Sequence, residues 1–526
     1  MLDWFNYYGL IFVVALLVPN VVYAIKNKNA TPSYRNKAAE TIEIISRFLC
    51  IALMIFNIPY TWIGFYFQFA KVVYLVVNSC LLVAYNIFWI VLRKKNGIVR
   101  TLLLSVIPTL VFLFSGVMIG SIPLVVSSVF FGATHILISV KNTDREEKGF
   151  VKRSIMILIA IILSFVFFFI AAFGGALIAA NVRTKKLSSM TWEDMVEYDV
   201  KGGAKISVAV IEDGKVSYFV RSKDIRKSWV ATDPSVHVSD GPLFDYEIGS
   251  ISKTFVGLLC AKAVQEGKLD LNSNISEYLP LDKNKYYPTV ERLLTHTSGY
   301  KAFYFEPQMI ANRLSPEKND FYGIGKDKIL LKVAKTELSD RSYPFVYSNF
   351  GIAVVGLVLE TIYDKPFYDL MNDYLKDLSL KNTEVNKQGG TLSGYWGWKN
   401  DDGYLPAGAI HSNLKDMTKY LNLYLKNDLE YLSDSYAEQK TIDANKPSYE
   451  AFNIRLDAIG LTWILDKKNG IVWHDGGTTK FNSYIGFTQD RKKGVVILSD
   501  LGPSEKISAT VIGAKILTDE ISSVYR

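Results

Sequence analysis

The stretch that decides the fold is FDYEIGSISKTFVGLLCAKAVQEGK, residues 244–268 of this 526-residue chain. An apolar, strand-like run ends at Gly249, and Ser250 then opens an amphipathic helical pattern that ends near Gly267. Lys253 follows Ser250 by one helical turn, so its amine can lie beside the serine hydroxyl and accept its proton if burial keeps the amine partly neutral. The segment therefore predicts a nucleophilic serine at the start of a helix.

Ser-x-x-Lys occurs four times in the chain, and only its context separates the four copies. The serines at 298, 315 and 412 lie in polar, loop-like surroundings, and we interpret these copies as coincidences. At Ser250 the hydroxyl would lie at a helix N-terminus, where backbone N–H groups favour developing negative charge. Ser250 is the predicted nucleophile and Lys253 its proton acceptor.

Two segments downstream carry side chains that complete such a site. Tyr347 and Asn349 precede the apolar run FGIAVVGLVLE; a Tyr beside a Lys ammonium can have a lowered pKa and shuttle a proton, and an Asn amide can bind a substrate carbonyl. His474, Gly476 and Gly477 end a predicted strand, where glycines let a substrate approach and the Gly477 N–H can complete an oxyanion hole with that of Ser250.

Other chemistries are not supported by the sequence. It contains no Gly-x-Ser-x-Gly elbow, no His-Glu-x-x-His pair and no Gly-rich phosphate loop. The three cysteines, Cys50, Cys80 and Cys260, provide neither a disulfide framework nor a metal site. We expect no metal and no cofactor.

Charge and hydropathy divide the chain at about residue 186. Residues 1–186 contain 18 Lys and Arg against 6 Asp and Glu, whereas the remainder contains 41 against 45. The basic excess lies between apolar runs, so we expect a lipid bilayer as partner and no nucleic acid. Domains are predicted at 1–186, a membrane domain with about six helices, and at 187–526. The six apolar stretches lie at roughly 6–25, 46–66, 70–92, 101–119, 121–140 and 155–180.

Lys and Arg clusters follow the first, third and fifth stretches, which predicts that odd spans end inside. The soluble domain is then extracellular, and the lack of disulfides suits a Gram-positive cell membrane. Asn57, Asn78, Asn86 and His135 are the polar residues noted within the spans; they are interpreted as interhelical hydrogen-bonding groups, with no paired carboxylate or Arg to indicate transport.

The order of elements predicts an α/β domain for the soluble part: strands come first, a helical subdomain is inserted in the middle, and antiparallel strands come last. Residues 205–221 alternate about an Asp213-Gly214 turn, and further turns are predicted at Asn469-Gly470 and around Lys493-Gly494, with a final helix over about 504–522.

Five motifs occur together in one order: FDYEIGSISKTF, LLTHTSGY (293–300), YSNFG (347–351), PAGAIHSNLKDM (406–417) and HDGGTTKFNSYIGF (474–487). Residues 190–526 thereby resemble the serine β-lactamase-related family, which includes class C β-lactamases, low-molecular-mass penicillin-binding proteins, D-alanyl-D-alanine carboxypeptidases, D-aminopeptidases and related esterases. The resemblance implies an antiparallel sheet flanked by helices, Ser250 as acylated nucleophile, Lys253 and Tyr347 as the proton-handling pair, and Asn349 as substrate ligand.

The third motif departs from the Lys-Thr-Gly of many members, because His474 stands in place of the lysine. An imidazole replaces a permanent cation, which disfavours efficient β-lactam hydrolysis and suits DD-peptidase or esterase members. Lys480 is a weaker candidate for binding a carboxylate, and His296 is expected to brace a loop.

Three functions remain open. The leading one is an outward-facing serine hydrolase acting on D-alanyl groups of the cell wall, either the D-Ala-D-Ala end of a stem peptide or a D-alanyl ester of teichoic acid. The others are a penicillin-binding sensor that stays acylated, and a transporter with a hydrolytic appendage. The sequence does not choose between peptide and ester.

Overall fold

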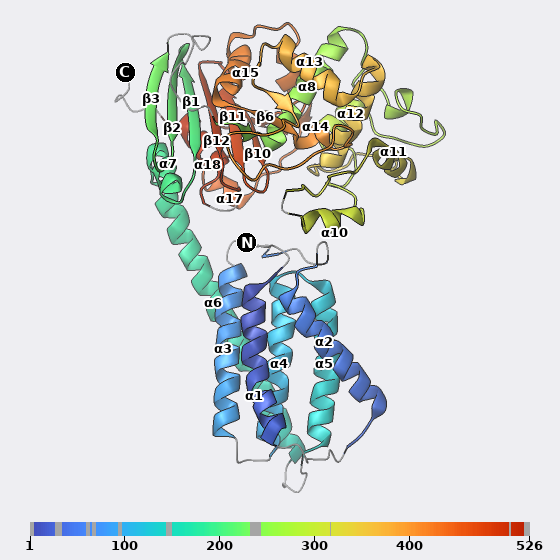
Figure 1. The fold of residues 1–526 in the computed structure, drawn as a ribbon, viewed down its shortest axis with the longest axis vertical. Helices are drawn as coiled ribbons and strands as arrows, with labels where there is room; N and C mark the ends of the chain where they lie inside the picture. Colours follow the sequence, from blue (N-terminus) through green and yellow to red (C-terminus); the bar gives the residue numbers. More distant parts are fainter. Residues whose placement is uncertain are drawn as a thin grey trace. The chain divides into compact units, whose positions relative to one another are not determined.

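The fold is taken from a computed structural model of the chain. It describes residues 5–26, 34–58, 61, 64–65, 70–92, 97–143, 150–231, 244–315, 317–503 and 506–519. Contacts divide the chain into two compact units, Met1–Lys186 and Leu187–Arg526 (Figure 1).

In the described parts of the N-terminal unit, six helices begin. They are α1 (Tyr7–Lys26), α2 (Lys37–Ile55), α3 (Ala70–Val91), α4 (Ile98–Met118), α5 (Ile122–Lys141) and α6 (Phe150–Ser188). Among the described residues, α1, α3, α4 and α5 are long and apolar enough to cross a membrane, by length and composition. These four coincide with the first, third, fourth and fifth predicted stretches, and α6 contains the sixth.

The second predicted stretch, 46–66, is wrong in its position. Helix α2 begins earlier, because the Asn36 side chain caps it by accepting from Ala39 N at 3.1 Å. It ends at Ile55, whose carbonyl accepts from Asn6 N at 2.8 Å, and Phe56 continues in extended backbone paired with Phe5. The segment around Phe5 and Asn6 thus provides the hydrogen-bond donor for the last carbonyl of α2.

The earlier start of α2 also corrects the expectation that the apolar helices hold no paired charges. Glu43 of α2 is 5% exposed and accepts hydrogen bonds from Arg47 on the same helix. Its carboxylate also lies 3.0 Å from Nδ1 of His135 on α5. Glu43 precedes the apolar stretch that begins at residue 46, so hydropathy places it outside the helix, whereas packing of α2 against α5 buries its carboxylate.

Many of the basic side chains that predict orientation lie outside the described residues. These are Lys28, Arg93, Lys94, Lys95, Arg145 and Lys148. The outward orientation stays a prediction.

The second unit is built on an antiparallel sheet whose strand order is β3-β2-β1-β12-β11-β10-β9-β8-β7 among the described residues. The strands are β1 (Ile206–Glu212), β2 (Lys215–Arg221), β3 (Arg226–Ala231), β7 (Lys440–Thr441), β8 (Ala458–Ile459), β9 (Ile464–Asp466), β10 (Ile471–Gly477), β11 (Asn482–Thr488) and β12 (Lys493–Ser499). Asp213 and Gly214 both have positive φ, as the predicted hairpin turn requires. The turn expected around Lys493-Gly494 lies earlier, at Arg491, whose φ is 60°.

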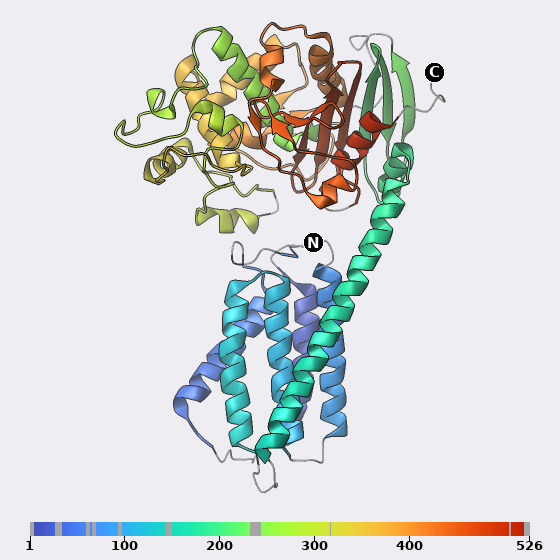
Figure 2. The ribbon, with the colours of Figure 1, turned by 180° about the vertical axis from the view of Figure 1, so that it is seen from behind.

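Helices cover both faces of this sheet. Helices α7 (Trp192–Lys201, green) and α18 (Ala509–Thr518, red) lie against the sheet in Figure 2. They share a hydrophobic core with Val208, Tyr484 and Ile497 on one face. Helix α15 (Leu414–Lys426) lies on the other face, where Leu421 approaches Gly494 of β12. Alternation of side chains along each strand produces these two faces.

The helical subdomain follows the nucleophile segment. Its main elements are η1 (Gly249–Ile251), α8 (Ser252–Gln265), α9 (Val290–Leu294), α10 (Gln308–Arg313), α11 (Lys326–Lys335), α12 (Asn349–Tyr363), α13 (Phe367–Asp377) and α14 (Leu405–Gly408). A small sheet in the order β4-β6-β5 joins β4 (Tyr246–Glu247), β6 (Ile410–Ser412) and β5 (Glu384–Val385). The predicted fold class, an apolar helical region followed by an α/β domain with a flanked antiparallel sheet, is confirmed.

Candidate active site

Ser250 lies in the turn η1, which leads directly into α8. Its side chain is partly exposed, whereas Lys253 on the first turn of α8 is fully buried. The Lys253 amine lies 2.9 Å from the Ser250 Oγ and donates to the Ala407 carbonyl at 2.6 Å. The nucleophile therefore faces solvent while the group that can accept its proton is shielded from water.

Burial lowers the pKa of Lys253 to about 7, and the nearby Asp475 carboxylate opposes this shift. A substantial fraction of the amine is then neutral at neutral pH and able to take a proton from Ser250. Asp475 was not among the predicted site residues. Its position one residue after His474 was the only sequence signal, since its proximity to Lys253 depends on how β10 packs against η1.

Tyr347 also lies beside Ser250 and Lys253. The Lys253 amine lies 5.0 Å from the centre of its ring, and a hydrogen bond links it to Ser250. The expectation that its pKa is lowered is wrong: burial raises it, and the Asp475 carboxylate raises it further, while the bond with Ser250 opposes them. Tyr347 is a neutral phenol at physiological pH.

Asn349 begins α12, which Ser348 caps by accepting from Gly351 N at 2.8 Å. The Asn349 Oδ1 is buried and has no hydrogen-bond partner among the described residues. This acceptor is open to an N–H or O–H group, whereas binding of a substrate carbonyl would use the Asn349 side-chain N–H groups, so the predicted role as substrate ligand stays a prediction.

His296 is part of the site wall, as its predicted role of bracing a loop requires. Its ring packs 4.5 Å from that of Tyr347, centre to centre, and its Nδ1 accepts from Ser348 N at 3.2 Å. Burial, together with Lys253 and His474, holds its pKa well below the usual value, so it is neutral. The Ser348–Tyr347 backbone is thereby fixed against the 296 loop.

His474 on β10 is 2% exposed, and its ring centre lies 6.4 Å from that of Tyr347. Burial lowers its pKa to about 3, with Lys253 lowering it further. The ring is therefore neutral, and because Nδ1 lies 2.6 Å from the Asp475 carbonyl, that nitrogen carries the proton. At the position of the family lysine, this chain presents no cation.

Gly476 and Gly477 allow the end of β10 to approach the nucleophile segment. A Cβ on Gly476 would lie 1.9 Å from the Ile248 carbonyl oxygen, and a Cβ on Gly249, whose φ is +51°, would lie 2.6 Å from Gly477 N. Gly477 N thus lies close to Gly249, the residue that precedes Ser250, and its part in an oxyanion hole stays a prediction. Gly476 has a packing reason to be glycine that is independent of substrate.

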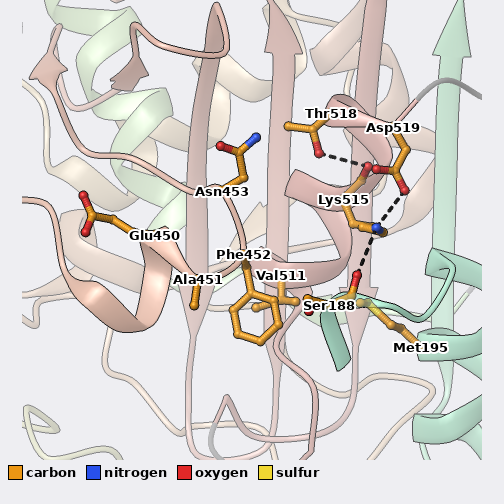
Figure 3. A pocket seen from close by; sticks show the side chains of 10 residues that line it. All are labelled: Ser188, Met195, Glu450, Ala451, Phe452, Asn453, Val511, Lys515, Thr518 and Asp519. Atoms are coloured by element: carbon orange, nitrogen blue, oxygen red, sulfur yellow. Dashed lines mark hydrogen bonds and ion pairs between the residues drawn. The ribbon is translucent and has the colours of Figure 1, made fainter. Parts of the chain in front are cut away.

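A separate cavity of about 280 Å³ lies at the start of α7 and the end of α18 (Figure 3). Lys515 on its wall contacts the Ser188 carbonyl at 3.3 Å and the Asp519 carboxylate at 3.1 Å. None of the predicted site residues lines it. In the part of the chain that the structure describes, no three His, Cys, Asp or Glu side chains are grouped to hold a metal ion.

The family model described as beta-lactamase matches residues 192–517. This chain belongs to the beta-lactamase family. The match starts at α7 and ends in α18, so the family domain includes the whole sheet, the helical subdomain and every predicted site residue.

Two similar proteins share less than a third of their aligned residues with this chain. Protein flp of Staphylococcus aureus (strain N315) is 23% identical to this chain over 339 residues. The alignment covers 59% of this chain and 62% of Protein flp, so this chain spans less than two thirds of that relative. It is 29% identical over 239 residues to a beta-lactamase of Providencia stuartii, covering 42% and 56%.

Solved structures of the family also match. The beta-lactamase/D-alanine carboxypeptidase from Yersinia pestis, complexed with citrate, is 19% identical, covers 64% of this chain and 98% of its own, and has a TM-score of 0.48. A class C beta-lactamase, also 19% identical, covers 64% and 99% with a TM-score of 0.46.

Proposed function

We propose that this protein is a membrane-anchored, outward-facing serine hydrolase that forms an acyl-enzyme on Ser250 and removes D-alanyl groups from the cell envelope. The observation that carries the proposal is the 2.9 Å separation between a partly exposed serine hydroxyl and a buried lysine amine whose pKa lies at about 7. Such a pair can activate a nucleophile at neutral pH without a metal or cofactor.

Acylation follows from these positions. Ser250 Oγ attacks the substrate carbonyl carbon, its proton passes to the Lys253 amine, and the N–H groups of Ser250 and Gly477 stabilise the oxyanion. The bond to the leaving group then breaks as that group takes up a proton delivered through the neutral Tyr347 phenol. Water attacks the ester on Ser250 by the reverse proton path and releases the acyl group.

The electrostatics of the site favour an ester over a free stem peptide. A D-Ala-D-Ala terminus carries a carboxylate beyond the scissile bond, and the neutral His474 offers it no charge-assisted hydrogen bond. The leaving group of a D-alanyl ester is a hydroxyl of the polyol phosphate backbone, so no carboxylate lies directly beyond the scissile bond. We therefore propose the D-alanyl ester of teichoic acid as the preferred substrate and the stem peptide as the second candidate.

The experiment is release of D-alanine by the purified full-length protein from D-alanylated teichoic acid and from a D-Ala-D-Ala stem peptide, each with Ser250→Ala as control. The proposal expects release that the variant lacks. If Ser250 is acylated but no D-alanine is released from either substrate, the protein is a sensor that stays acylated, and the hydrolase proposal fails.

The orientation needs its own experiment. Protease added to intact, wall-stripped cells should digest residues 187–526. Digestion only after lysis would place the hydrolase inside.

A further inference from the structure

A buried carboxylate outside the predicted set lies three residues before the nucleophile. Glu247 on β4 is 2% exposed, and its carboxylate accepts from the Thr478 hydroxyl at 2.6 Å and from the Trp396 backbone N–H. Burying a charge costs free energy unless hydrogen bonds compensate it, and these two donors supply that compensation.

The two donors belong to segments that border Ser250. Thr478 directly follows Gly477 at the end of β10. Trp396 lies in the loop between β5 and α14, and its indole N–H donates to the Thr479 hydroxyl at 2.9 Å. One carboxylate therefore joins three segments that are far apart in sequence.

A second set of contacts shows how closely these segments are held. The Ser483 hydroxyl of β11 donates to the Ile248 carbonyl at 2.8 Å, next to Glu247. The close approach of Gly249 to Gly477 leaves no room for a side chain between them. Movement of Thr478 would therefore change where Gly477 N lies relative to Ser250.

The groups that face Glu247 do not replace its hydrogen bonds. Opposite it on β6 is His411, whose Nε2 lies 3.7 Å from Oε1 and whose pKa burial lowers to about 4, so it is neutral. Tyr395 stacks on His411 and donates to the Asp245 carbonyl at 2.7 Å, while the Asp245 carboxylate pairs with Lys387 at 2.8 Å. Burial raises the pKa of Glu247 to about 7, while its two donors oppose the shift.

We propose that Glu247 is a positioning residue for acyl transfer: by holding Thr478 and the Trp396 loop against the nucleophile segment, it keeps the Gly477 N–H directed at the developing oxyanion of the Ser250 adduct. Glu247 itself does not touch the substrate. The inference rests on the proposed acyl-enzyme at Ser250. It predicts that loosening the carboxylate–Thr478 bond slows acylation without weakening binding of a small substrate.

The test uses the full-length protein, a small chromogenic ester and pH 8.5, where Glu247 is ionised and Lys253 neutral. Thr478→Val removes the hydroxyl and keeps the shape, whereas Thr478→Ser keeps the hydroxyl. Asp466→Asn is the control for loss of a buried carboxylate elsewhere, because Asp466 is 2% exposed and accepts from Asn469 N at 2.9 Å in the β9–β10 turn. Glu247→Gln is the second variant. Acylation rate, KM and Tm are measured for each.

We expect Thr478→Val to lower the acylation rate by about 10- to 100-fold, less than the ~10²–10³ for outright loss of an oxyanion donor, with KM nearly unchanged. Thr478→Ser should retain most of the rate, and Glu247→Gln should behave like Thr478→Val. Asp466→Asn should lower only Tm.

An acylation rate for Thr478→Val equal to that of the wild type overturns the inference, as does a loss in Thr478→Ser equal to that in Thr478→Val. If wild type and Ser250→Ala react alike with the ester, the proposed function fails instead, so the two failures are distinguishable. If Glu247→Gln does not fold, the comparison of Thr478→Val with Thr478→Ser still tests the inference.

Discussion

The Lys253 amine and the Ser250 hydroxyl oxygen lie 2.9 Å apart, one buried and the other open to solvent. The short distance lets the proton move directly between them, and burial brings the pKa of the amine down to about 7. Below that pH the ammonium holds its proton and cannot activate the serine. The pair therefore sets both the reaction and its pH dependence.

We expect kcat/KM for an ester to fall as the pH drops through about 7, because protonation removes the base. Asp475→Asn removes the carboxylate that raises the pKa of Lys253. The acid limb of the profile, the pH range in which kcat/KM falls as the base is protonated, should therefore move to lower pH. Asp340→Asn, at a carboxylate whose side chain is 78% exposed, is the matched control and should leave the limb in place. A limb that stays unmoved in Asp475→Asn would contradict the assignment of Lys253 as base.

Tyr347→Phe removes the phenol O–H while keeping the ring that packs against His296 and Lys253. We expect kcat to fall by about 10²–10⁴-fold, the usual contribution of a positioned proton donor. Since the pKa of Tyr347 is raised, the wild type should show no loss of activity from its ionisation between about pH 8 and 10. An alkaline limb in that interval that disappears in Tyr347→Phe would show an ionised tyrosine instead.

Gly476→Ala should destabilise the domain, because its Cβ would lie 1.9 Å from a backbone carbonyl that cannot move aside cheaply. Overpacking of this kind costs about 1–3 kcal/mol or more. Gly325→Ala is the control, since nothing lies within 4 Å of a Cβ there and its φ is −70°. Urea unfolding compares the two; equal free energies of unfolding would remove the packing argument.

His474→Ala should lower kcat/KM modestly, by about 10- to 100-fold, or ~1.4–2.7 kcal/mol, if the neutral ring positions substrate. Its pKa of about 3 means that its ionisation should not shape the profile between pH 5 and 8. His474→Lys should strengthen binding of ligands with a free carboxylate, because it supplies a cation. A loss in His474→Ala as large as that in Ser250→Ala, on a small activated ester as well as on the natural substrate, would show that His474 does chemistry itself.

Local patterns predicted the fold well wherever a signal lies within one element. The Asp213-Gly214 hairpin, the helix after Ser250 and the strand that carries His474 near its end are all visible in the sequence, because turn chemistry and periodicity are local properties. The end of α2 was missed, since Asn6, far away in sequence, satisfies its last carbonyl.

The site was predicted as a set of residue types, whereas its electrostatics required the three-dimensional structure. The raised pKa of Tyr347 and the lowered pKa of His474 arise from burial and from charges on other elements. The sequence shows Glu247 and Asp475 only as acidic residues within strand-like runs and does not indicate their contacts. What they contact depends on how β10, the Trp396 loop and η1 pack together.

The most direct test of the central claim is the intact mass of the full-length protein after brief exposure to an acylating ester or a penicillin, with peptide mapping of the modified residue. The account predicts one acyl adduct, located on Ser250 and absent from Ser250→Ala. An adduct of equal yield in Ser250→Ala, or one that maps to another residue in the wild type, would contradict it.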